Sequence, residues 1–504
     1  MKSRPGWAAL YAFEVDRAAD APVFRQVYLQ LRSAILSGAL RPATKLPSTR
    51  ELATQLGISR SAAVAAFEQL LAEGYAFGKK GAGTFIASDL PEPFDAVRGR
   101  RKRSASIPKP MDSRELRDFV DVTSQSDERP FNLGRTLIDA RTAELWRKLN
   151  ARTLRSFDGH HLGYGDPQGM LTLRRSVCDY LQAARAVRCE PEQVLITAGT
   201  QQAVDLVARI MLGPDKEVWV EDPGYPLTRL ALVAAGAKLR PIPVDRRGLD
   251  VSEGIRRAPK ARAVFITPSH QFPKGVVLSM ARRLELLAWA RESGAWIVED
   301  DYASEFRYGG RPLASLQGLD EAERVIYIGT FNKALFPGLR LGYAVLPPQL
   351  VRSFVTARYL IDRQPSTLCQ AVVAAFMEEG HFASHIRRMR DKYRLQRDAL
   401  VTALRRRLGE HLIVDPPDQG MHLVAYTRRG LSDVGIERAA REHDVVVRAM
   451  SRLHIEAPPQ SGLMLGFSGY PHQSIAPAIA RLARAFERQP QGQVRGRDRR
   501  VSIS

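Results

Sequence analysis

The sequence predicts a multidomain α/β protein in which a small winged helix-turn-helix unit precedes a larger domain built on a mainly parallel sheet. Its length of 504 residues exceeds what one ordinary hydrophobic core accommodates. In residues 22–88, helical patterns around a glycine turn precede a basic, glycine-rich hairpin. In residues 129–488, apolar strand-like runs alternate with helical patterns. These observations predict two domains of different size and fold.

The smaller domain is predicted to contain three helices and a wing. An apolar pattern at helical spacing predicts the first helix. Ser48 and Glu51 form a capping-box pattern that starts the second helix. Gly57 ends that helix, and Ser59 caps the third. Two short strands around a basic tip follow, which completes a winged helix.

This arrangement is typical of proteins that bind double-stranded DNA, with the third helix in the major groove. Polar and basic residues at the helix starts and on the wing are expected to contact promoter DNA, those on the wing mainly through phosphates. They are Arg50, Ser59, Arg60, Ser61, Lys79, Lys80 and Thr84. The net charge of +21 fits attraction to a nucleic acid, and an arginine-rich surface composition explains it equally well.

Two basic segments lie outside the predicted domains. Residues 89–128 are rich in Pro, Ser and charge and predict a flexible linker, and residues 489–504 predict a disordered tail. No apolar run approaches the length of a membrane-spanning helix, and the N-terminus lacks a signal-peptide core. Together with three scattered cysteines, this predicts a cytoplasmic protein that does not bind a membrane.

The segment that most strongly indicates a chemical function follows the strand-like run at residues 325–330. The run ends in Thr330, and Lys333 and Arg340 come after it. A lysine held at a strand end can form a Schiff base with an aldehyde cofactor. The hydroxyl and guanidinium groups suit a phosphate. The pattern therefore indicates a site for pyridoxal phosphate (PLP).

Two further strand ends carry groups that fit the same cofactor, and the carboxyl ends of parallel strands share one edge of a sheet. Gly199, Thr200 and Gln201 present backbone N–H groups at a helix start, which suits a phosphate. Tyr225 is fixed between prolines and can stack on a flat ring, although a packed loop tyrosine gives the same pattern.

A fourth strand-like run ends in the carboxylates of Glu299, Asp300 and Asp301, followed by Tyr302. Three carboxylates can bind a divalent metal ion. They can also place one carboxylate against the ring nitrogen of PLP, with the tyrosine donating to the ring oxygen. No second group of acids or histidines completes a metal site, so we favour PLP and expect no metal.

These elements, in this order, resemble fold type I aminotransferases over residues 130–488. Residues 163–169 and 267–275 are similar to further loops of that family. The resemblance implies that Tyr164 reaches the cofactor phosphate of a partner subunit, hence a homodimer. It also implies three catalytic residues, Lys333, Asp300 and Tyr302. The implied cofactor-binding set is Lys333, Asp300, Tyr302, Tyr225, Gly199, Thr200, Gln201, Thr330, Arg340, Tyr164, His270 and Gln271.

With the winged helix in front, residues 22–488 resemble the MocR/GabR group of bacterial transcription regulators, whose N-terminal domain is of GntR type. The resemblance implies a regulator that senses PLP or an amino-acid-like amine through an aldimine at Lys333. The alternative is a working aminotransferase with an accessory DNA-binding domain, and half-transamination is compatible with both. Met464 stands where many aminotransferases bind the substrate carboxylate with an arginine. Arg448 and Arg452 are the two possible replacements.

Overall fold

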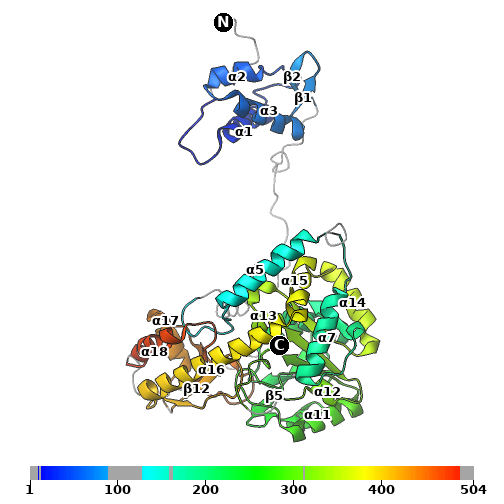
Figure 1. The fold of residues 1–504 in the computed structure, drawn as a ribbon, viewed down its shortest axis with the longest axis vertical. Helices are drawn as coiled ribbons and strands as arrows, with labels where there is room; N and C mark the ends of the chain where they lie inside the picture. Colours follow the sequence, from blue (N-terminus) through cyan, green and yellow to red (C-terminus); the bar gives the residue numbers. More distant parts are fainter. Residues whose placement is uncertain are drawn as a thin grey trace. The chain divides into compact units, whose positions relative to one another are not determined.

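The computed structural model describes residue 10 and residues 13–88, 128–157, 163–309, 313–428 and 430–487. The chain forms two compact units, Met1–Asp118 and Phe119–Ser504, each considered by itself below (Figure 1). The predicted architecture, a winged helix-turn-helix followed by an α/β domain with a mainly parallel sheet, is confirmed. Apart from Glu128, the predicted linker lies outside the described residues, and so does the predicted tail.

The first unit contains three helices and a two-stranded wing. Ser48 and Glu51 form the predicted capping box at the start of the second helix, and Ser59 caps the third. Gly57 ends the second helix in the left-handed conformation, with φ of 63°. The wing strands pair antiparallel, with Lys79 opposite Gly83. The elements are α1 (Val23–Leu36), α2 (Thr49–Leu56), α3 (Arg60–Ala72), β1 (Ala76–Lys79) and β2 (Gly83–Ile86).

A segment before α1 packs across this unit, and we call Leu10 with residues 13–21 the N-terminal strap. Leu10 is fully buried in the core of the unit. The side chains of Gln26 and Gln30 on α1 exchange hydrogen bonds with the strap backbone. Arg17 donates from Nη2 to the carbonyl oxygen of Gly57, at 2.6 Å. The strap precedes residue 22, where the sequence predicts the domain to begin.

An eight-stranded sheet forms the centre of the second unit, in the order β3-β10-β9-β8-β7-β4-β5-β6. Strands β5, β4, β7, β8 and β9 run parallel. Strand β10 runs antiparallel to both β3 and β9, so β3 points the same way as the parallel strands. The strands are β3 (Val194–Thr197), β4 (Glu217–Asp222), β5 (Lys238–Asp245), β6 (Gly248–Leu249), β7 (Ala263–Ile266), β8 (Trp296–Asp301), β9 (Val325–Thr330) and β10 (Gly342–Val345).

Apolar side chains leave the central strands on both faces, and helices cover both faces (Figure 1). In β4, Val218 and Val220 enter one core, while Trp219 enters another and stacks on Trp289 with ring centroids 3.8 Å apart. The helices are α5 (Ala140–Arg155), α7 (Leu171–Arg185), α8 (Thr200–Met211), α9 (Pro226–Ala234), α10 (Val251–Arg257), α11 (Met280–Ser293), α12 (Leu316–Leu319), α13 (Phe331–Ala334), α14 (Pro348–Asp362) and α15 (Thr367–Glu378), with 3₁₀ turns η3 (Pro191–Gln193) and η4 (Pro337–Leu339).

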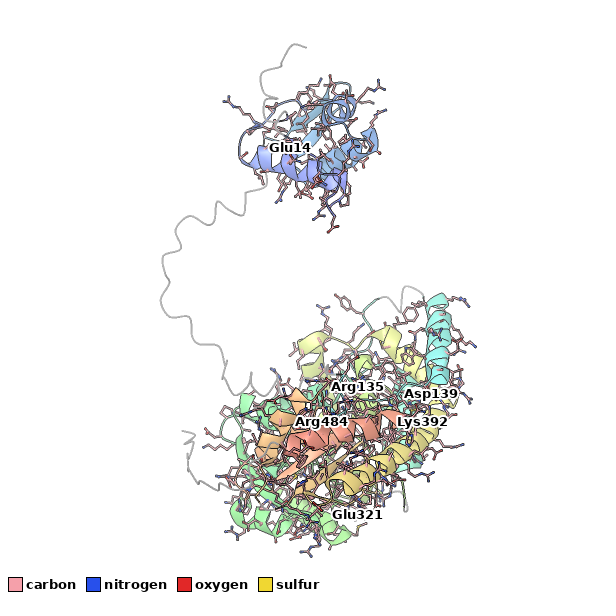
Figure 2. All side chains as sticks on the ribbon, turned by 90° about the vertical axis from the view of Figure 1, so that its left-hand side faces the viewer. Glu14, Arg135, Asp139, Glu321, Lys392 and Arg484 are labelled. Carbon is pink, nitrogen blue, oxygen red and sulfur yellow. The ribbon has the colours of Figure 1, made fainter. Side chains whose placement is uncertain are left out.

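The long helix α16 leads into a second, antiparallel sheet in the order β11-β12-β14-β13, which we call the C-terminal sheet. Helices α16 and α18 pack on one face of it (Figure 2). Lys392 on α16 pairs with Asp139, the N-cap residue of α5, at 3.5 Å. The elements are α16 (His381–Leu408), β11 (Leu412–Val414), β12 (His422–Thr427), α17 (Asp433–Glu442), β13 (Arg448–Ala449), η5 (Ser451–Leu453), β14 (Gly462–Gly466) and α18 (His472–Glu487). None of the described helices is long and apolar enough to cross a membrane.

Candidate functional site

The carboxyl ends of β3, β4, β7, β8 and β9 lie at one edge of the large sheet, and the predicted site residues follow them. Strands β8 and β9 are neighbours, with Asp300 opposite Ile328, and neighbouring strands lie about 4.8 Å apart. Thr330, the last residue of β9, caps α13 by accepting from the backbone N–H of Asn332 at 3.1 Å. Lys333 lies in that short helix. The predicted carboxylate and the predicted lysine are therefore on adjacent strand ends.

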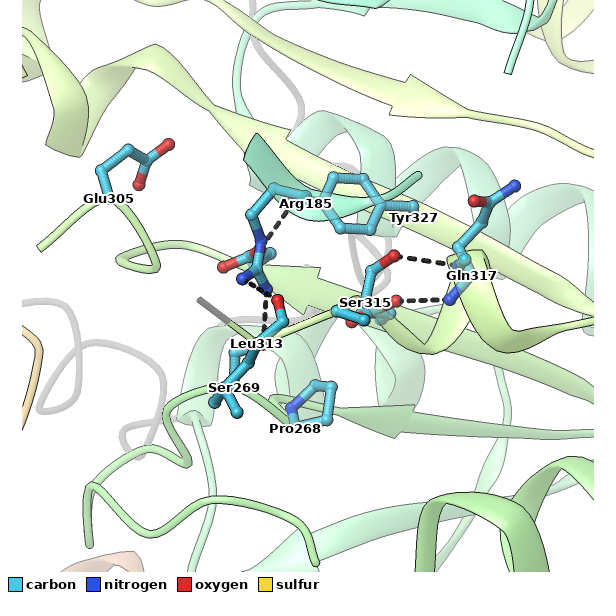
Figure 3. A network of polar contacts seen from close by, with 12 residues as sticks. Arg185, Pro268, Ser269, Glu305, Leu313, Ser315, Gln317 and Tyr327 are labelled. Carbon is cyan, nitrogen blue, oxygen red and sulfur yellow. Dashed lines mark hydrogen bonds and ion pairs between the residues drawn. The ribbon is translucent and has the colours of Figure 1, made fainter. Parts of the chain in front are cut away.

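The structure separates the three carboxylates at the end of β8, because successive strand residues point to opposite faces. Glu299 accepts two hydrogen bonds of 3.0 Å from backbone N–H groups at the start of α12. Asp301 accepts from Arg185 Nε at 2.8 Å and from the hydroxyl of Tyr327 at 2.7 Å (Figure 3). The Oδ1 atom of Asp300 is buried and has no hydrogen-bond partner among the described residues. Asp300 is therefore the carboxylate open to a ligand.

Arg185, the last residue of α7, connects three segments behind this edge (Figure 3). Besides binding Asp301, its guanidinium donates to the carbonyl oxygen of Leu313 at 2.5 Å and to Ser269 Oγ at 2.7 Å. Ser269 directly precedes His270 in the loop after β7. Arg185 thus fixes the end of β8 relative to the loop after β7.

A pocket beside Asp300 is lined by Tyr225, Glu221, Thr267 and Arg229, among other residues. The carboxylate of Glu221 accepts from Thr267 Oγ1 at 2.6 Å. Burial raises the pKa of Glu221 to about 8. Burial, with the charge of Asp301, raises the pKa of Asp300 to about 7. This environment disfavours an isolated negative charge, so a cationic ring nitrogen beside Asp300 would be stabilising.

The amine of Lys333 donates to the carbonyl oxygen of Gly134 at 3.2 Å. Burial disfavours the ammonium form and lowers the pKa of Lys333 to about 8. The hydroxyl of Tyr302 and both ring nitrogens of His270 are buried without a hydrogen-bond partner among the described residues. The ring centres of Tyr302 and His270 lie 5.9 Å apart. The site thus combines a lysine that is easily deprotonated with several polar atoms that a ligand can satisfy.

The predicted phosphate-binding residues also meet at this edge. A Cβ atom at Gly199, which has φ of 110°, would lie 3.0 Å from the side chain of Asn332, so the turn after β3 packs on the turn after β9. Gly342 of β10 pairs with the last residues of both β3 and β9. This pairing brings Arg340, which is exposed, to the same place. The residues collected here are Gly199, Thr200, Gln201, Thr330 and Arg340.

Two other predicted site residues, Tyr164 and Gln271, do not belong to this group. Tyr164 is 80 % exposed, and the guanidinium of Arg363 lies 4.6 Å from its ring centre. Among the described residues, no contact joins Tyr164 to the site of its own chain. Gln271 is buried, and its side-chain amide binds locally, donating to the carbonyl oxygen of Pro223 at 2.8 Å and accepting from the N–H of Lys274 at 3.1 Å. Its amide therefore has less capacity for a ligand than His270 has.

Sequence reasoning missed His422 and the carbonyl of Gly134. His422 on β12 has its ring 5.5 Å from that of His270. Burial lowers the pKa of His422 to about 4, and the charge of Lys333 contributes. The C-terminal sheet therefore reaches the site. No local sequence motif indicates either residue. Glu221, by contrast, belongs to the same segment as Tyr225, so the sequence could have indicated it.

The predicted DNA contacts lie on the surface of the first unit. Arg60 is the first residue of α3, and Lys79 and Lys80 lie at the tip of the wing. Ser59 has a structural role as well, since its hydroxyl accepts from the N–H of Ala62 at 3.2 Å. Thr84 is half-buried, and the exposed members of the set are Arg50, Ser59, Arg60, Ser61, Lys79 and Lys80.

Comparison with known proteins agrees with both units. Residues 24–86 match bacterial regulatory proteins of the gntR family, and residues 131–482 match aminotransferase class I and II. The chain is 40 % identical, over 94 % of its length and 95 % of the relative's, to the "probable rhizopine catabolism regulatory protein MocR" of Rhizobium meliloti. The chain belongs to the MocR-type regulators of the GntR family. The regulator interpretation is thereby favoured over a working aminotransferase with an accessory DNA-binding domain.

Other relatives of this MocR-type regulator fall into two groups. It is 30 % identical to the pyridoxine biosynthesis transcriptional regulator PdxR of Corynebacterium glutamicum, over 91 % of this chain and 95 % of that one. The multiple substrate aminotransferase of Thermococcus profundus matches 75 % of this chain and 95 % of its own, with 28 % identity and a TM-score of 0.68. The kynurenine aminotransferase of Pyrococcus horikoshii matches 78 % and 98 %, with 27 % identity and a TM-score of 0.67.

Proposed function

We propose that the second unit binds PLP and that amines reaching this cofactor change how the first unit engages promoter DNA. One observation carries the proposal. At a single sheet edge, a lysine of lowered pKa follows β9, and the end of the neighbouring β8 carries a carboxylate oxygen of Asp300 and a hydroxyl of Tyr302 that have no hydrogen-bond partner among the described residues. A protein without a ligand at this place would leave these groups buried and unsatisfied, at a cost of roughly 1–3 kcal/mol for each group.

The residues present fit PLP well. Asp300 would pair with the ring nitrogen, Tyr302 would donate to the ring oxygen, and Tyr225 would stack on the ring. The phosphate would lie among Thr200, Gln201, Thr330 and Arg340, where the start of α8 adds backbone N–H groups. His270 would lie beside the ring, and Lys333 would hold the cofactor covalently. When bound, PLP supplies an electrophilic carbon for amines and an electron sink.

The surroundings of Lys333 suit it to hold the cofactor covalently. Its lowered pKa leaves a substantial neutral fraction near neutral pH, and the neutral amine is the nucleophilic form. The carbonyl of Gly134 orients Nζ when the amine is free. Beside the bound cofactor, Nζ of Lys333 could take up and return a proton. The residues that bind and orient the cofactor are the same whether the chain senses amines or turns them over.

We further propose a cytoplasmic homodimer in which Tyr164 serves the partner's site. Its ring is 80 % exposed, and Leu360 on α14 is 78 % exposed. Arg363 lies over the rings of both Tyr164 and Tyr359, at 4.6 Å and 5.7 Å. An exposed aromatic and aliphatic surface of this kind favours an interface. A dimer would also present two winged helices to two half-sites of a promoter.

A combined absorbance and gel-shift experiment tests the proposal. The protein would be mixed with its own upstream DNA, with and without PLP and a panel of small amines. We expect a cofactor absorbance band, and DNA binding that changes when an amine is added. Lys333→Ala should lose the band and the amine response while retaining DNA binding, and Lys260→Ala, at an exposed lysine of the same unit, should behave as wild type. If neither PLP nor any amine alters the spectrum or the DNA complex, the proposal fails.

The retained lysine, carboxylate and tyrosine favour one secondary candidate function. The same three groups support half-transamination of a bound amine, and a full cycle needs only a keto acid in addition. Steady-state turnover of an amino donor and a keto acid, with no amine-dependent change in DNA binding, would make the chain an aminotransferase with an accessory DNA-binding domain. Amine-dependent DNA binding without turnover would leave the regulator as the sole function.

A further inference from the structure

The turn at the start of α8, residues 198–201, carries the backbone N–H groups proposed to bind the cofactor phosphate, and we call it the phosphate turn. Gln202, in the first turn of the helix, reaches back over it. Its Oε1 atom accepts from the N–H of Ala198 at 2.8 Å. Its own backbone N–H donates to the carbonyl oxygen of Gly199 at 3.2 Å. Gln202 therefore fixes the peptide plane with which the phosphate turn begins.

Two side chains of α14 hold the amide of Gln202. Nη1 of Arg358 donates to Oε1 of Gln202 at 2.9 Å, and Nε2 of Gln202 donates to Oδ2 of Asp362 at 2.9 Å. Arg358 also forms an ion pair with Asp362, one helical turn further on. Because Arg358 and Ala198 donate to the same oxygen, Nη1 lies less than about 6 Å from the nitrogen of Ala198. These partners allow one orientation of the amide, with its oxygen towards the phosphate turn.

An apolar contact between α14 and α8 keeps this polar network in place. Phe354 of α14 shares a buried cluster with Ala203 and Val207 of α8, and Ala357 packs against the same cluster. Arg358 follows Phe354 by one helical turn, and Ala203 directly follows Gln202. The packing of the two helices thus sets the position from which the guanidinium reaches Gln202.

Fold stability alone does not explain an arginine at position 358. The side chain of Arg358 is 0 % exposed, and its Nε and Nη2 atoms are buried without a hydrogen-bond partner among the described residues. Buried charge and unsatisfied donors both oppose folding. Asp362 is 40 % exposed, so water can solvate its carboxylate if the arginine is replaced. An apolar side chain would fill the same space at less cost, which indicates that the arginine is kept for its contact with Gln202.

We propose that Arg358 is a positioning residue for the cofactor phosphate, and that it acts indirectly by holding Gln202 and thereby the phosphate turn. The proposal rests on the proposed function, because it requires the phosphate to lie at the start of α8. It adds to the phosphate site a residue of α14, the helix whose exposed Leu360 belongs to the proposed dimer surface. Arg358 lies 156 residues after Gln202, so no local motif could indicate this role.

Equilibrium absorbance titrations of the full chain with PLP and with pyridoxal, which lacks the phosphate, test the proposal. The ratio of the two affinities isolates the contribution of the phosphate, because a loss of folded protein or of lysine reactivity weakens both. Arg358→Met should reduce this ratio on the order of tenfold, as expected when a hydrogen bond to a charged group is weakened. A ratio equal to that of the wild-type protein would overturn the proposal.

Two further variants show whether Arg358 acts through Gln202. Gln202→Leu should also reduce the ratio on the order of tenfold, because the N–H of Ala198 loses its acceptor. The double variant should have the same ratio as Gln202→Leu alone, since the guanidinium then has no amide to hold. A ratio that falls in the double variant by the product of the two single effects would overturn the indirect role.

Arg282→Met is the matched control. Arg282 on α11 is also a buried arginine paired with a half-exposed aspartate, since its side chain is 7 % exposed and its Nη1 lies 2.6 Å from Oδ1 of Asp245. Its replacement should lower stability and leave the ratio of PLP to pyridoxal affinity unchanged. A ratio reduced as much as in Arg358→Met would show that the loss of any buried arginine has this effect, and would overturn the assignment.

Failure of this proposal is distinguishable from failure of the proposed function. If Arg358→Met does not fold, Gln202→Leu decides, and an unchanged ratio in that variant would overturn the proposal. If the wild-type protein forms no cofactor band with PLP, the proposed function itself fails. If the wild-type protein binds PLP no more tightly than pyridoxal, the phosphate gains nothing from the phosphate turn, and the role of Arg358 is refuted while covalent attachment at Lys333 stands.

Discussion

At the scale of single residues, the end of β8 shows how neighbouring carboxylates acquire different roles. Glu299 and Asp301 satisfy backbone and side-chain donors, while Asp300 keeps a buried oxygen without a partner among the described residues. Because the three acids are consecutive, the sequence alone is compatible with a metal site or with a single carboxylate contact to the cofactor. Strand alternation and the hydrogen-bond network select Asp300 for the ligand.

Exchanging each aspartate for asparagine should separate these roles. Asp301→Asn breaks a buried ion pair with Arg185 and should lower the free energy of unfolding by about 3–5 kcal/mol. Asp300→Asn should instead raise the free energy of unfolding at pH 8 in the absence of PLP. The raised pKa of Asp300 means that the folded state loses stability as pH rises from the unfolded pKa towards about 7, and asparagine removes that loss.

Urea denaturation of the cofactor-free chain at pH 4 and pH 8 measures both effects, and absorbance titration measures PLP affinity. Asp300→Asn should weaken PLP binding at least tenfold, about 1.4 kcal/mol, despite its higher stability at pH 8. If both variants lose stability equally, the distinction between a structural and a ligand-binding carboxylate is wrong.

The pKa of Lys333 predicts the pH dependence of cofactor attachment. Since the neutral amine reacts and the pKa is about 8, the attachment rate should rise about tenfold per pH unit below 8 and level off above it. Stopped-flow absorbance of cofactor-free protein mixed with PLP, between pH 6 and about 10, measures the profile. Asp300→Asn serves as the control, because the inflection should remain when that carboxyl no longer titrates. A rate that still rises about tenfold per pH unit up to pH 10, as expected from the ordinary lysine pKa of 10.5, would contradict the prediction.

At the scale of elements, local chemistry was enough to predict the helix-turn-helix. The capping box at Ser48, the cap at Ser59 and the left-handed Gly57 act through hydrogen bonds and backbone preferences within a few residues. The N-terminal strap could not be predicted, because its backbone is bound by Gln26 and Gln30 across the unit. Its hydrogen bonds depend on the tertiary fold.

The same distinction holds in the second unit. Thr330 and Lys333 are linked by the strand-to-helix turn in which both lie, so a motif reveals them. His422 reaches the site because the C-terminal sheet packs beside it, and the segment containing Gly134 lies far away in sequence. Long-range packing of this kind leaves no periodic signal. Strand ends were therefore predictable, whereas the contributions of His422 and Gly134 were not.

The winged helix supplies a prediction that separates affinity from specificity. Lys79→Ala with Lys80→Ala should weaken binding to promoter and random DNA alike, and should reduce the salt slope of the binding constant by about 1 for each lost phosphate contact. Arg60→Ala should lower the preference for promoter DNA by about 1–3 kcal/mol. Fluorescence anisotropy at several salt concentrations measures both, with Arg25→Ala on α1 as the control. A salt slope unchanged in the double variant would exclude phosphate contacts by the wing tip.

At the scale of the whole molecule, Tyr164 connects the cofactor site to the assembly. The tyrosine is exposed on its own chain, and the proposed homodimer would place it at the cofactor phosphate of a partner subunit. Both properties are satisfied if each site takes its lysine from one chain and its tyrosine from the other. Such sites would exist only in the dimer, so cofactor binding and dimer formation would stabilise one another.

Mixing two defective chains tests this shared site. Tyr164→Ala alone should weaken PLP binding, and Lys333→Ala alone should form no covalent band. In a mixed dimer, the chain that retains Lys333 receives an intact Tyr164 from its partner, so one of its two sites is complete. Random re-association of equal amounts should therefore restore about a quarter of all sites to wild-type affinity. If Tyr164 acted on its own chain, every lysine-bearing site would still lack it, and mixing would restore none. Absorbance titration after co-refolding or subunit exchange measures the restored fraction.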